Sequence, residues 1–140
     1  MALDADDPVD DDPGVSVLRQ ISREMVEKQK HRWGRGPKNV KSYMFDDLVL
    51  IVMRGGLTVA EQTMLDFGQH DLVRRFRQTF ENEMVAELSA MIEPLTGRRV
   101  LTSQSQIMFD PHVVVEIFVL DHSPGAVERY AATELIVEDD

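Results

Sequence analysis

The sequence has no cysteine, a single tryptophan and no long apolar run. Without cysteine, the chain can form no disulfide bond, no thiolate zinc site and no thiol nucleophile, which fits a reducing compartment. The longest apolar run, Leu48 to Met53, is far too short to cross a bilayer, so we do not expect an integral membrane protein. At 140 residues the chain has room for one hydrophobic core, and one domain is expected.

The start of the sequence also lacks a basic, apolar leader. Its first twelve residues include six aspartates and no Lys or Arg, the opposite of a secretory signal, and we expect a cytoplasmic protein. The last seven residues add four acids, and the two ends together account for the whole net charge of -10. We therefore predict an acidic disordered tail over residues 1–13, a single α+β domain over 14–121 and a partly disordered C-terminal extension over 122–140.

Two of the predicted helices are bounded by clear local signals. From Val15 to Arg32 apolar residues recur at helical spacing, until the loop Gly34-Arg35-Gly36-Pro37 interrupts the pattern. Thr58 and Glu61 have the spacing of a capping box, in which the Thr oxygen and the Glu carboxylate each accept a bond from the other residue's amide. This pattern predicts the start of a short helix.

A much longer helix is predicted after Gly68. Pro94 and Gly97 mark its end, because neither residue continues a helix easily. Its apolar stripe contains Leu72, Phe76, Phe80, Met84, Leu88, Met91, Ile92 and Leu95.

Four segments rich in β-branched and aliphatic residues predict two hairpins. Val40–Phe45 and Leu48–Arg54 flank a turn at Asp46-Asp47, and Arg99–Phe109 is followed by Val113–Leu120. The predicted fold class is α+β. Two antiparallel β-hairpins form a sheet packed by one long and two shorter α-helices, in two layers.

The composition of individual strands indicates their surroundings. Leu48–Met53 is apolar at both parities and should be covered on both faces, either by helices or by a second copy of the chain. Thr102–Gln106 is polar at both parities, which indicates an edge strand or the wall of a wet site. Beyond Leu120 the pattern weakens: Ala126–Ala132 fits a short helix, and Leu135–Val137 fits a stray strand or a tail.

Six basic residues without an intervening acid surround the Gly-Arg-Gly-Pro loop. They are Lys28, Lys30, Arg32, Arg35, Lys38 and Lys41. Exposed amides and the planar guanidinium of Arg35 suit phosphate or a carbonate-like anion. The alternative is a solvated helix end at which cations interact favourably with the helix dipole.

Arginines near the start of the long helix form a second basic group. Arg74 and Arg77 either meet an acidic partner or form ion pairs with Asp71 and Glu81. The predicted anion- or partner-binding residues are Arg35, Gly36, Lys38, Lys41, Arg74 and Arg77.

Other kinds of site find little support. Trp33 and the lysines could contact a nucleic acid, but a body without net positive charge and two acidic ends would repel a polyanion. The four histidines show no metal-ligand spacing, so no metal and no cofactor is predicted. Neither a GxSxG elbow, a P-loop nor a GxGxxG motif is present, and no residue is predicted to be catalytic.

Several ordered motifs resemble those of a known small-domain family. They are Gly34-Arg35-Gly36-Pro37, Leu57-Thr58 with Glu61, Leu95-Thr96-Gly97-Arg98 with Val100, and Asp110-Pro111 leading to Glu116-Ile117-Phe118-Val119-Leu120. From about Val15 to Leu120 the chain resembles the bacterial family named after MpsC, the third component of a sodium-translocating, membrane-potential-generating system. The positions of family-typical character are Gly34, Arg35, Gly36, Pro37, Thr58, Glu61, Gly97 and Arg98.

The resemblance implies an accessory or regulatory subunit associated with sodium-coupled uptake of inorganic carbon by a membrane protein. No catalytic residue follows from it. We therefore expect a non-catalytic, homodimeric module that docks on an integral membrane transport protein or binds a small anion, and that lies at the inner face of the membrane only through a partner. The alternatives are an enzyme for a small anionic substrate, with its site between Thr102–Gln106 and the basic loop, or a nucleic-acid-binding protein.

Overall fold

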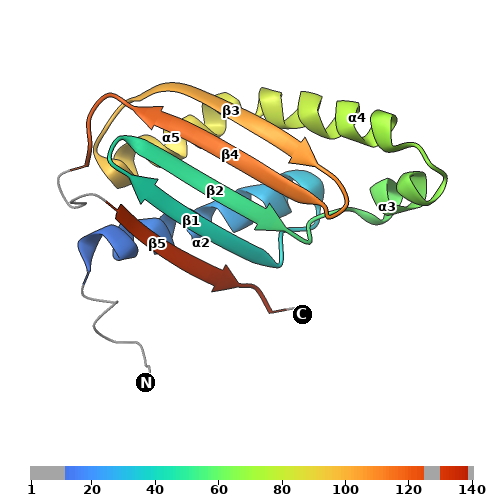
Figure 1. The fold of residues 1–140 in the computed structure, drawn as a ribbon, viewed down its shortest axis with the longest axis horizontal. Coiled ribbons are helices and arrows are strands. Elements are labelled where there is room, and N and C mark those ends of the chain that lie inside the picture. The colour runs from blue at the N-terminus through green and yellow to red at the C-terminus, as the bar shows by residue number, and fades with distance from the viewer. Residues whose placement is uncertain (1–11, 125–129, 139–140) are drawn as a thin grey trace.

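Five antiparallel strands form one sheet in the order β3-β4-β2-β1-β5 (Figure 1). The computed structural model describes residues 12–124 and 130–138. The strands are β1 (Asn39–Phe45), β2 (Leu48–Arg54), β3 (Val100–Met108), β4 (Val113–Leu120) and β5 (Tyr130–Ile136). The described helices are α2 (Pro13–Trp33), α3 (Val59–Asp66), α4 (His70–Glu83) and α5 (Val85–Thr96).

Helices α2, α4 and α5 lie on one face of this sheet (Figure 1). Helix α2 lies against β5 and β1, whereas α4 and α5 lie against β3, and α3 packs on α4. A buried bond between the hydroxyls of Ser22 and Ser42, 2.6 Å long, ties α2 to β1. The arrangement is therefore a two-layer α+β fold, as the sequence predicts.

The hydrophobic core lies between the two layers. Alternate residues of β2, namely Val49, Ile51 and Met53, point into it and are buried. The residues between them, Leu48, Leu50 and Val52, are only partly buried. The sequence predicts that Leu48–Met53 is covered on both faces. The described helices cover only the face of Val49, Ile51 and Met53.

Both predicted hairpins are present, as β1 with β2 and β3 with β4. The polar strand β3 lies at one edge of the sheet, as its composition indicates. The other edge is β5, which the sequence did not predict as a full strand. The predicted helix over Ala126–Ala132 is wrong for residues 130–132, which belong to β5, and its first residues lie outside the described ones. Residues 130–132 are extended because β5 pairs with β1. This pairing satisfies the backbone N–H and C=O groups of β1, which would otherwise be the edge strand of the sheet.

The predicted long helix is two helices. Met84, between α4 and α5, has φ -82° and ψ -7°, and its N–H is shared between the carbonyls of Phe80 and Glu81, as is common at a helix end. The prediction of one long and two shorter helices is therefore wrong, and the longest described helix is α2, with 21 residues.

The buried face of α4 also differs from the predicted stripe. Leu72 and Phe76 are 44% and 56% exposed, while Val73, Arg77 and Glu81 point inward. Burial of charged side chains is tolerated only where they are paired, and in α4 they are paired with each other and with α3.

The ends of the described chain refine the predicted boundaries. Most of the predicted tail 1–13 lies outside the described residues, but Asp12 caps α2 by accepting a bond from the N–H of Gly14 at 2.8 Å, and Pro13 is the first helical residue. Part of the predicted extension 122–140 belongs to the sheet, as β5.

Candidate functional site

The loop between α2 and β1 is held in one shape by its glycines. Gly34 has a φ of 78° and its N–H donates to the Lys30 carbonyl at 2.8 Å, which ends α2. A Cβ at Gly36 would lie 3.3 Å from both the Lys30 Cβ and the Val26 carbonyl oxygen, so this position leaves little room for a side chain. The N–H of Lys38 donates to the Arg54 carbonyl at 2.8 Å and fixes the loop to the end of β2.

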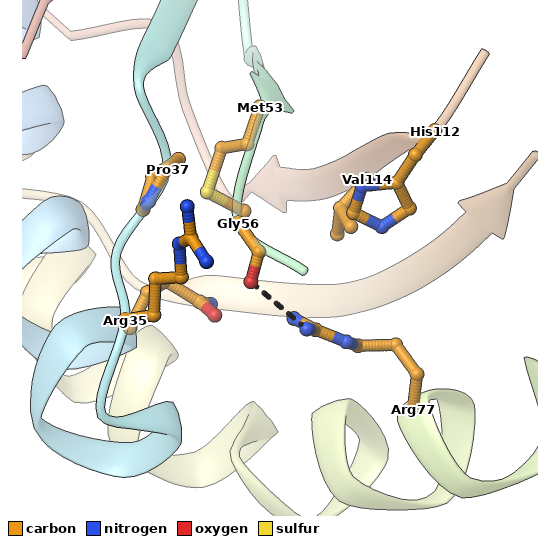
Figure 2. Close-up of a pocket in the computed structure, with 8 residues that line it drawn as sticks. Arg35, Pro37, Met53, Gly56, Arg77, His112 and Val114 are labelled. Carbon is orange, nitrogen blue, oxygen red and sulfur yellow. Dashed lines mark hydrogen bonds between the residues drawn. The ribbon is translucent and has the colours of Figure 1, made fainter. Parts of the chain in front are cut away.

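This geometry presents the side chain of Arg35. Among the described residues, Arg35 is exposed and has no hydrogen-bond or ion-pair partner for its side chain. Figure 2 draws a small cavity beside the loop, with the Arg35 guanidinium between Pro37 and Gly56 and with Arg77 and His112 farther across the cavity. A cation without a carboxylate partner is available for an external anion.

Arg35 lines a groove of about 440 Å³, which we call the Arg35 groove. Its lining residues are Arg35, Lys38, Gly55, Leu57, Val59, Gln62, Thr63 and His112. They provide a guanidinium, an ammonium, an amide and a hydroxyl, and no carboxylate is among them. The volume is within the range of small-molecule sites, and the donor set suits an oxyanion.

Two other spaces adjoin Arg35. A groove of about 610 Å³ on the α2 side is lined by Glu27 and Glu138 as well as by basic residues, so its charge is mixed. A small cavity of about 10 Å³, lined among others by Arg77 and His112, has about the volume that one water molecule needs. Of the three spaces, the Arg35 groove has the donor set best suited to an anion.

His112 is the functional candidate that the sequence patterns missed. Both ring nitrogens are buried and have no hydrogen-bond partner among the described residues. Burial first, and the charge of Arg77 second, lower its pKa to about 4 against the opposing effect of Glu61. The imidazole is therefore neutral near pH 7, with one nitrogen donating and one accepting. The only local signal was its place beside the turn that ends β3.

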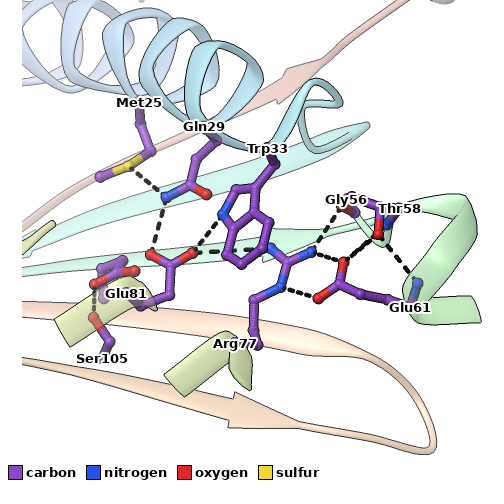
Figure 3. Close-up of polar contacts among 10 residues, drawn as sticks. Met25, Gln29, Trp33, Gly56, Thr58, Glu61, Arg77, Glu81 and Ser105 are labelled. Atoms are coloured by element: carbon purple, nitrogen blue, oxygen red, sulfur yellow. Dashed lines mark hydrogen bonds and ion pairs between the residues drawn. The ribbon is translucent and has the colours of Figure 1, made fainter. Parts of the chain in front are cut away.

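Behind the groove lies a buried cluster of charges, shown in Figure 3. Arg77 is 2% exposed, and its Nε donates to Glu61 Oε2 at 2.8 Å, while its Nη2 donates to Glu61 Oε1 and, at 3.1 Å, to the Gly56 carbonyl. The guanidinium lies over the ring of Trp33. Arg77 thus joins α4 to α3 and to Gly56, which lies between the groove-lining residues Gly55 and Leu57.

Glu61 has two functions in this cluster. It completes the predicted capping box, because the Thr58 N–H donates to its Oε1 at 2.9 Å and its own N–H donates to the Thr58 hydroxyl. Burial raises its pKa, but the hydrogen bonds from Arg77 and Thr58 outweigh that effect and lower the pKa of Glu61 below 4.5. The ionised carboxylate therefore balances Arg77.

The cluster continues to the centre of the sheet through two more carboxyl groups. Glu81 accepts bonds from Gln29 Nε2 at 3.2 Å and from Trp33 Nε1 at 3.0 Å. Glu116, on β4, accepts a bond from the Ser105 hydroxyl. Burial and then the charge of Glu81 raise the pKa of Glu116 well above 4.5, which favours its neutral form.

The other predicted binding residues do not all reach the Arg35 groove. Arg35, Gly36 and Lys38 come together in the loop. Lys41 lies on β1 at the parity that faces away from the helices. Arg74 forms an ion pair with Asp71 at 3.2 Å, and Arg77 forms the predicted pair with Glu81 at 3.8 Å in addition to its bonds to Glu61.

The remaining predicted motif residues have structural surroundings. Gly97 ends α5 with a φ of 72°, and Arg98 Nε donates to the Ser123 carbonyl at 3.2 Å. The polar strand segment Ser103–Gln106 lines a separate groove of about 980 Å³ against α4, with Arg74 and Arg75. This groove and the Arg35 groove have no lining residue in common, so the segment and the basic loop do not enclose one site.

No three His, Asp or Glu side chains among the described residues lie close enough together to hold a metal ion. None of the described helices combines the length and apolar character needed to span a membrane.

The chain was also compared with known proteins. A model of the family described as "Na+-translocating membrane potential-generating system (MpsC)" matches residues 15–122, well over half of the chain. No curated protein and no solved structure matches.

Proposed function

The chain belongs to the MpsC family, and from this membership and the geometry of the Arg35 groove we propose that it is a non-catalytic accessory module that binds a small oxyanion. The observation that carries the proposal is the unpartnered guanidinium of Arg35 in a groove lined by Lys38 and by no carboxylate. The anions that fit this chemistry are planar or tetrahedral oxyanions such as bicarbonate and phosphate.

The name of the family supports the setting of this function. In our proposal the module acts with an integral membrane protein of a sodium-translocating system and reports the presence of the anion to it. The protein works in the cytoplasm, at the inner face of the membrane, as a homodimer. The proposal assigns no reaction to the chain, because no carboxylate lines the groove and both ring nitrogens of His112 are buried.

The binding residues in this proposal are narrower than the sequence prediction. Arg35 and Lys38 bind the anion, Gly36 lets the loop pack closely on α2, and the ring of His112 closes one side of the groove. Arg77 acts from behind the groove by holding the Gly56 carbonyl. Lys41 and Arg74 lie outside the groove, and their proposed role is to contact partner proteins.

Titration calorimetry with bicarbonate, phosphate and sulfate tests anion binding. The double variant Arg35→Ala, Lys38→Ala should lose at least about ten-fold in affinity, since each hydrogen bond to a charged group is worth about 1.5–3 kcal/mol. The matched control is Lys28→Ala, Arg32→Ala, which removes the same charge from the neighbouring turn of α2, where both residues pair with Glu87. This control should bind within about two-fold of the unmodified chain.

Two results would contradict the proposal. Absence of measurable heat with all three anions would exclude an oxyanion ligand. An equal loss in both double variants would mean that net charge, not the groove, determines binding. Recovery of an integral membrane protein by cross-linking from native cells, reduced by the Arg35 and Lys38 substitutions, would test the accessory role separately.

A further inference from the structure

One face of the sheet carries no described helix (Figure 1). Its side chains alternate with those of the core, so the pairing register identifies them. Tyr43, Leu50 and Ile117 lie side by side in the middle row, and Phe45, Leu48 and Val119 lie in the next row. We call this surface the open face.

The open face is apolar in its centre and polar at one margin. Leu48, Leu50 and Val52 of β2 are partly exposed, and Phe45 is 43% exposed. The edge strand β3 contributes polar side chains, among them Gln104 beside Ile117. A contiguous apolar surface rimmed by polar residues is typical of a protein interface.

The β1–β2 hairpin that crosses the open face has opposite charges at its two ends. Asp46 and Asp47 form its turn, and both are exposed. At the other end Arg54 is exposed, and Lys41 lies one row nearer the centre, on the same face as Leu50. None of these four side chains has an ion-pair partner among the described residues.

We infer that the open face binds a second copy of this chain, with the two β1–β2 hairpins antiparallel across the interface. A two-fold axis that lies in the interface, along the row of Tyr43 and Leu50 and perpendicular to the strands, places Arg54 of each copy opposite Asp47 of the other. The dimer then contains two such Arg–Asp contacts. A two-fold axis parallel to the strands would instead place Arg54 opposite Arg54. Charge therefore selects the antiparallel arrangement.

The size of the open face is sufficient for a stable dimer. Five strands about 4.8 Å apart, with seven residues at about 3.3 Å each, span about 24 Å by 23 Å, or roughly 1,100 Å² for two copies. This area clears the threshold of about 1,000 Å² for a specific interface. The β1–β2 hairpin is also self-complementary, because it is apolar in the middle and carries acids at one end and bases at the other, which is what a two-fold related copy requires.

This inference rests on the proposed homodimer but not on the anion groove. Light scattering should give twice the 15.9 kDa mass of one chain. Leu50→Glu places two charges at the axis and should give the mass of one chain, while circular dichroism stays that of a folded protein. The control Phe67→Glu, at a site 69% exposed between α3 and α4, should remain dimeric. A monomeric unmodified chain, or a dimeric Leu50→Glu variant, would overturn the inference.

A charge exchange tests the orientation at exposed positions where folding is not at risk. Arg54→Asp and Asp47→Arg should each raise the dissociation constant of the homodimer by about ten-fold, because each creates two like-charge contacts. Asp47 is preferred to Asp46, which has a φ of 54° that few residues adopt readily.

An equimolar mixture of the two variants should then form a heterodimer of normal affinity, since both contacts in it join Arg to Asp. Failure of the mixture to recover would overturn the antiparallel arrangement. The Arg35→Ala, Lys38→Ala variant should stay dimeric, so loss of anion binding and loss of the dimer are separate results.

Discussion

The guanidinium carbon of Arg77 lies 3.7 Å from the centre of the Trp33 ring, which in turn lies 4.0 Å from the ring of Phe80. Trp33 is the last residue of α2, and Arg77 is in the middle of α4. The contact joins the end of the helix that precedes the basic loop to the charged cluster behind the Arg35 groove. Stability of the cluster and shape of the groove are thus linked through these two residues.

Removal of Arg77 should destabilise the fold strongly. Arg77→Ala leaves the buried carboxylates of Glu61 and Glu81 without their cation, and breaking a buried pair costs about 3–5 kcal/mol. The free energy of unfolding in urea measures this loss, and the fluorescence of Trp33, the only tryptophan, reports on the site itself.

Arg75→Ala is the matched control for Arg77. It removes the same charge from an exposed position of the same helix and should change the free energy of unfolding by no more than about 0.5 kcal/mol. Similar small changes in both variants would show that the cluster does not stabilise the fold.

Glu116 should make the protein less stable as the pH rises. Its pKa is raised in the folded state, so above pH 4.5 the folded chain still holds a proton that the unfolded chain has released, and the free energy of unfolding falls with pH until the folded pKa is passed. Glu116→Gln mimics the protonated acid and should remove this decrease. Unfolding in urea at pH about 5 and about 8 measures the difference, with the exposed Glu83→Gln as the control. An unchanged pH slope in Glu116→Gln would contradict the assignment.

His112 should make the protein less stable at acidic pH. Its folded pKa of about 4 lies below the ordinary 6.5, so the unfolded chain binds a proton that the folded chain does not, and stability falls as the pH decreases from 6.5 towards 4. His112→Phe, which keeps a ring beside Phe109, should lose less stability over this window. The exposed His31→Asn variant should behave like the unmodified chain. Equal acid sensitivity of all three proteins would refute this assignment to His112.

Substitution of Gly55 should weaken anion binding in the Arg35 groove, and substitution of Gly68 should not. Both have positive φ, 84° and 78°, so Ala costs about 1–2 kcal/mol in backbone strain at either position. A Cβ at Gly55 would also lie 3.1 Å from the Lys38 side chain, whereas nothing lies within 4 Å of one at Gly68. Gly55→Ala should therefore weaken anion binding in calorimetry, and Gly68→Ala should only lower stability. Equal anion affinity in the two variants would show that Gly55 does not shape the anion-binding groove.

Much of the local structure could be predicted from the sequence. Both hairpins, the capping box of Thr58 and Glu61 and the end of α2 at Gly34 depend on neighbours within a few residues, whose side-chain period and backbone preferences are visible in the sequence. The Arg35 loop was identified for the same reason, because its glycines and its run of basic residues are contiguous.

The features that the sequence did not predict depend on contacts between distant segments. The helical spacing from Leu72 to Leu88 is real, but burial of Arg77 and Glu81 turns Leu72 and Phe76 outward and Met84 interrupts the helix. Strand β5 has only a weak pattern of its own, and its conformation is set by the free edge of β1. His112 enters the site only because the end of β3 returns to the basic loop.

The sequence by itself determined the fold class, the two hairpins, the end of α2 at Gly34, the absence of cysteine chemistry and the place of the basic loop, because periodicity, capping and composition are local properties. Only the tertiary structure decided which cations are available. Arg35 and Arg77 are the same residue type. Arg35 lies on a glycine-rich loop with no side-chain partner among the described residues, whereas Arg77 is enclosed by Glu61, Glu81 and Trp33. Burial and partner geometry set this difference, and both arise from segments that meet only when the chain folds.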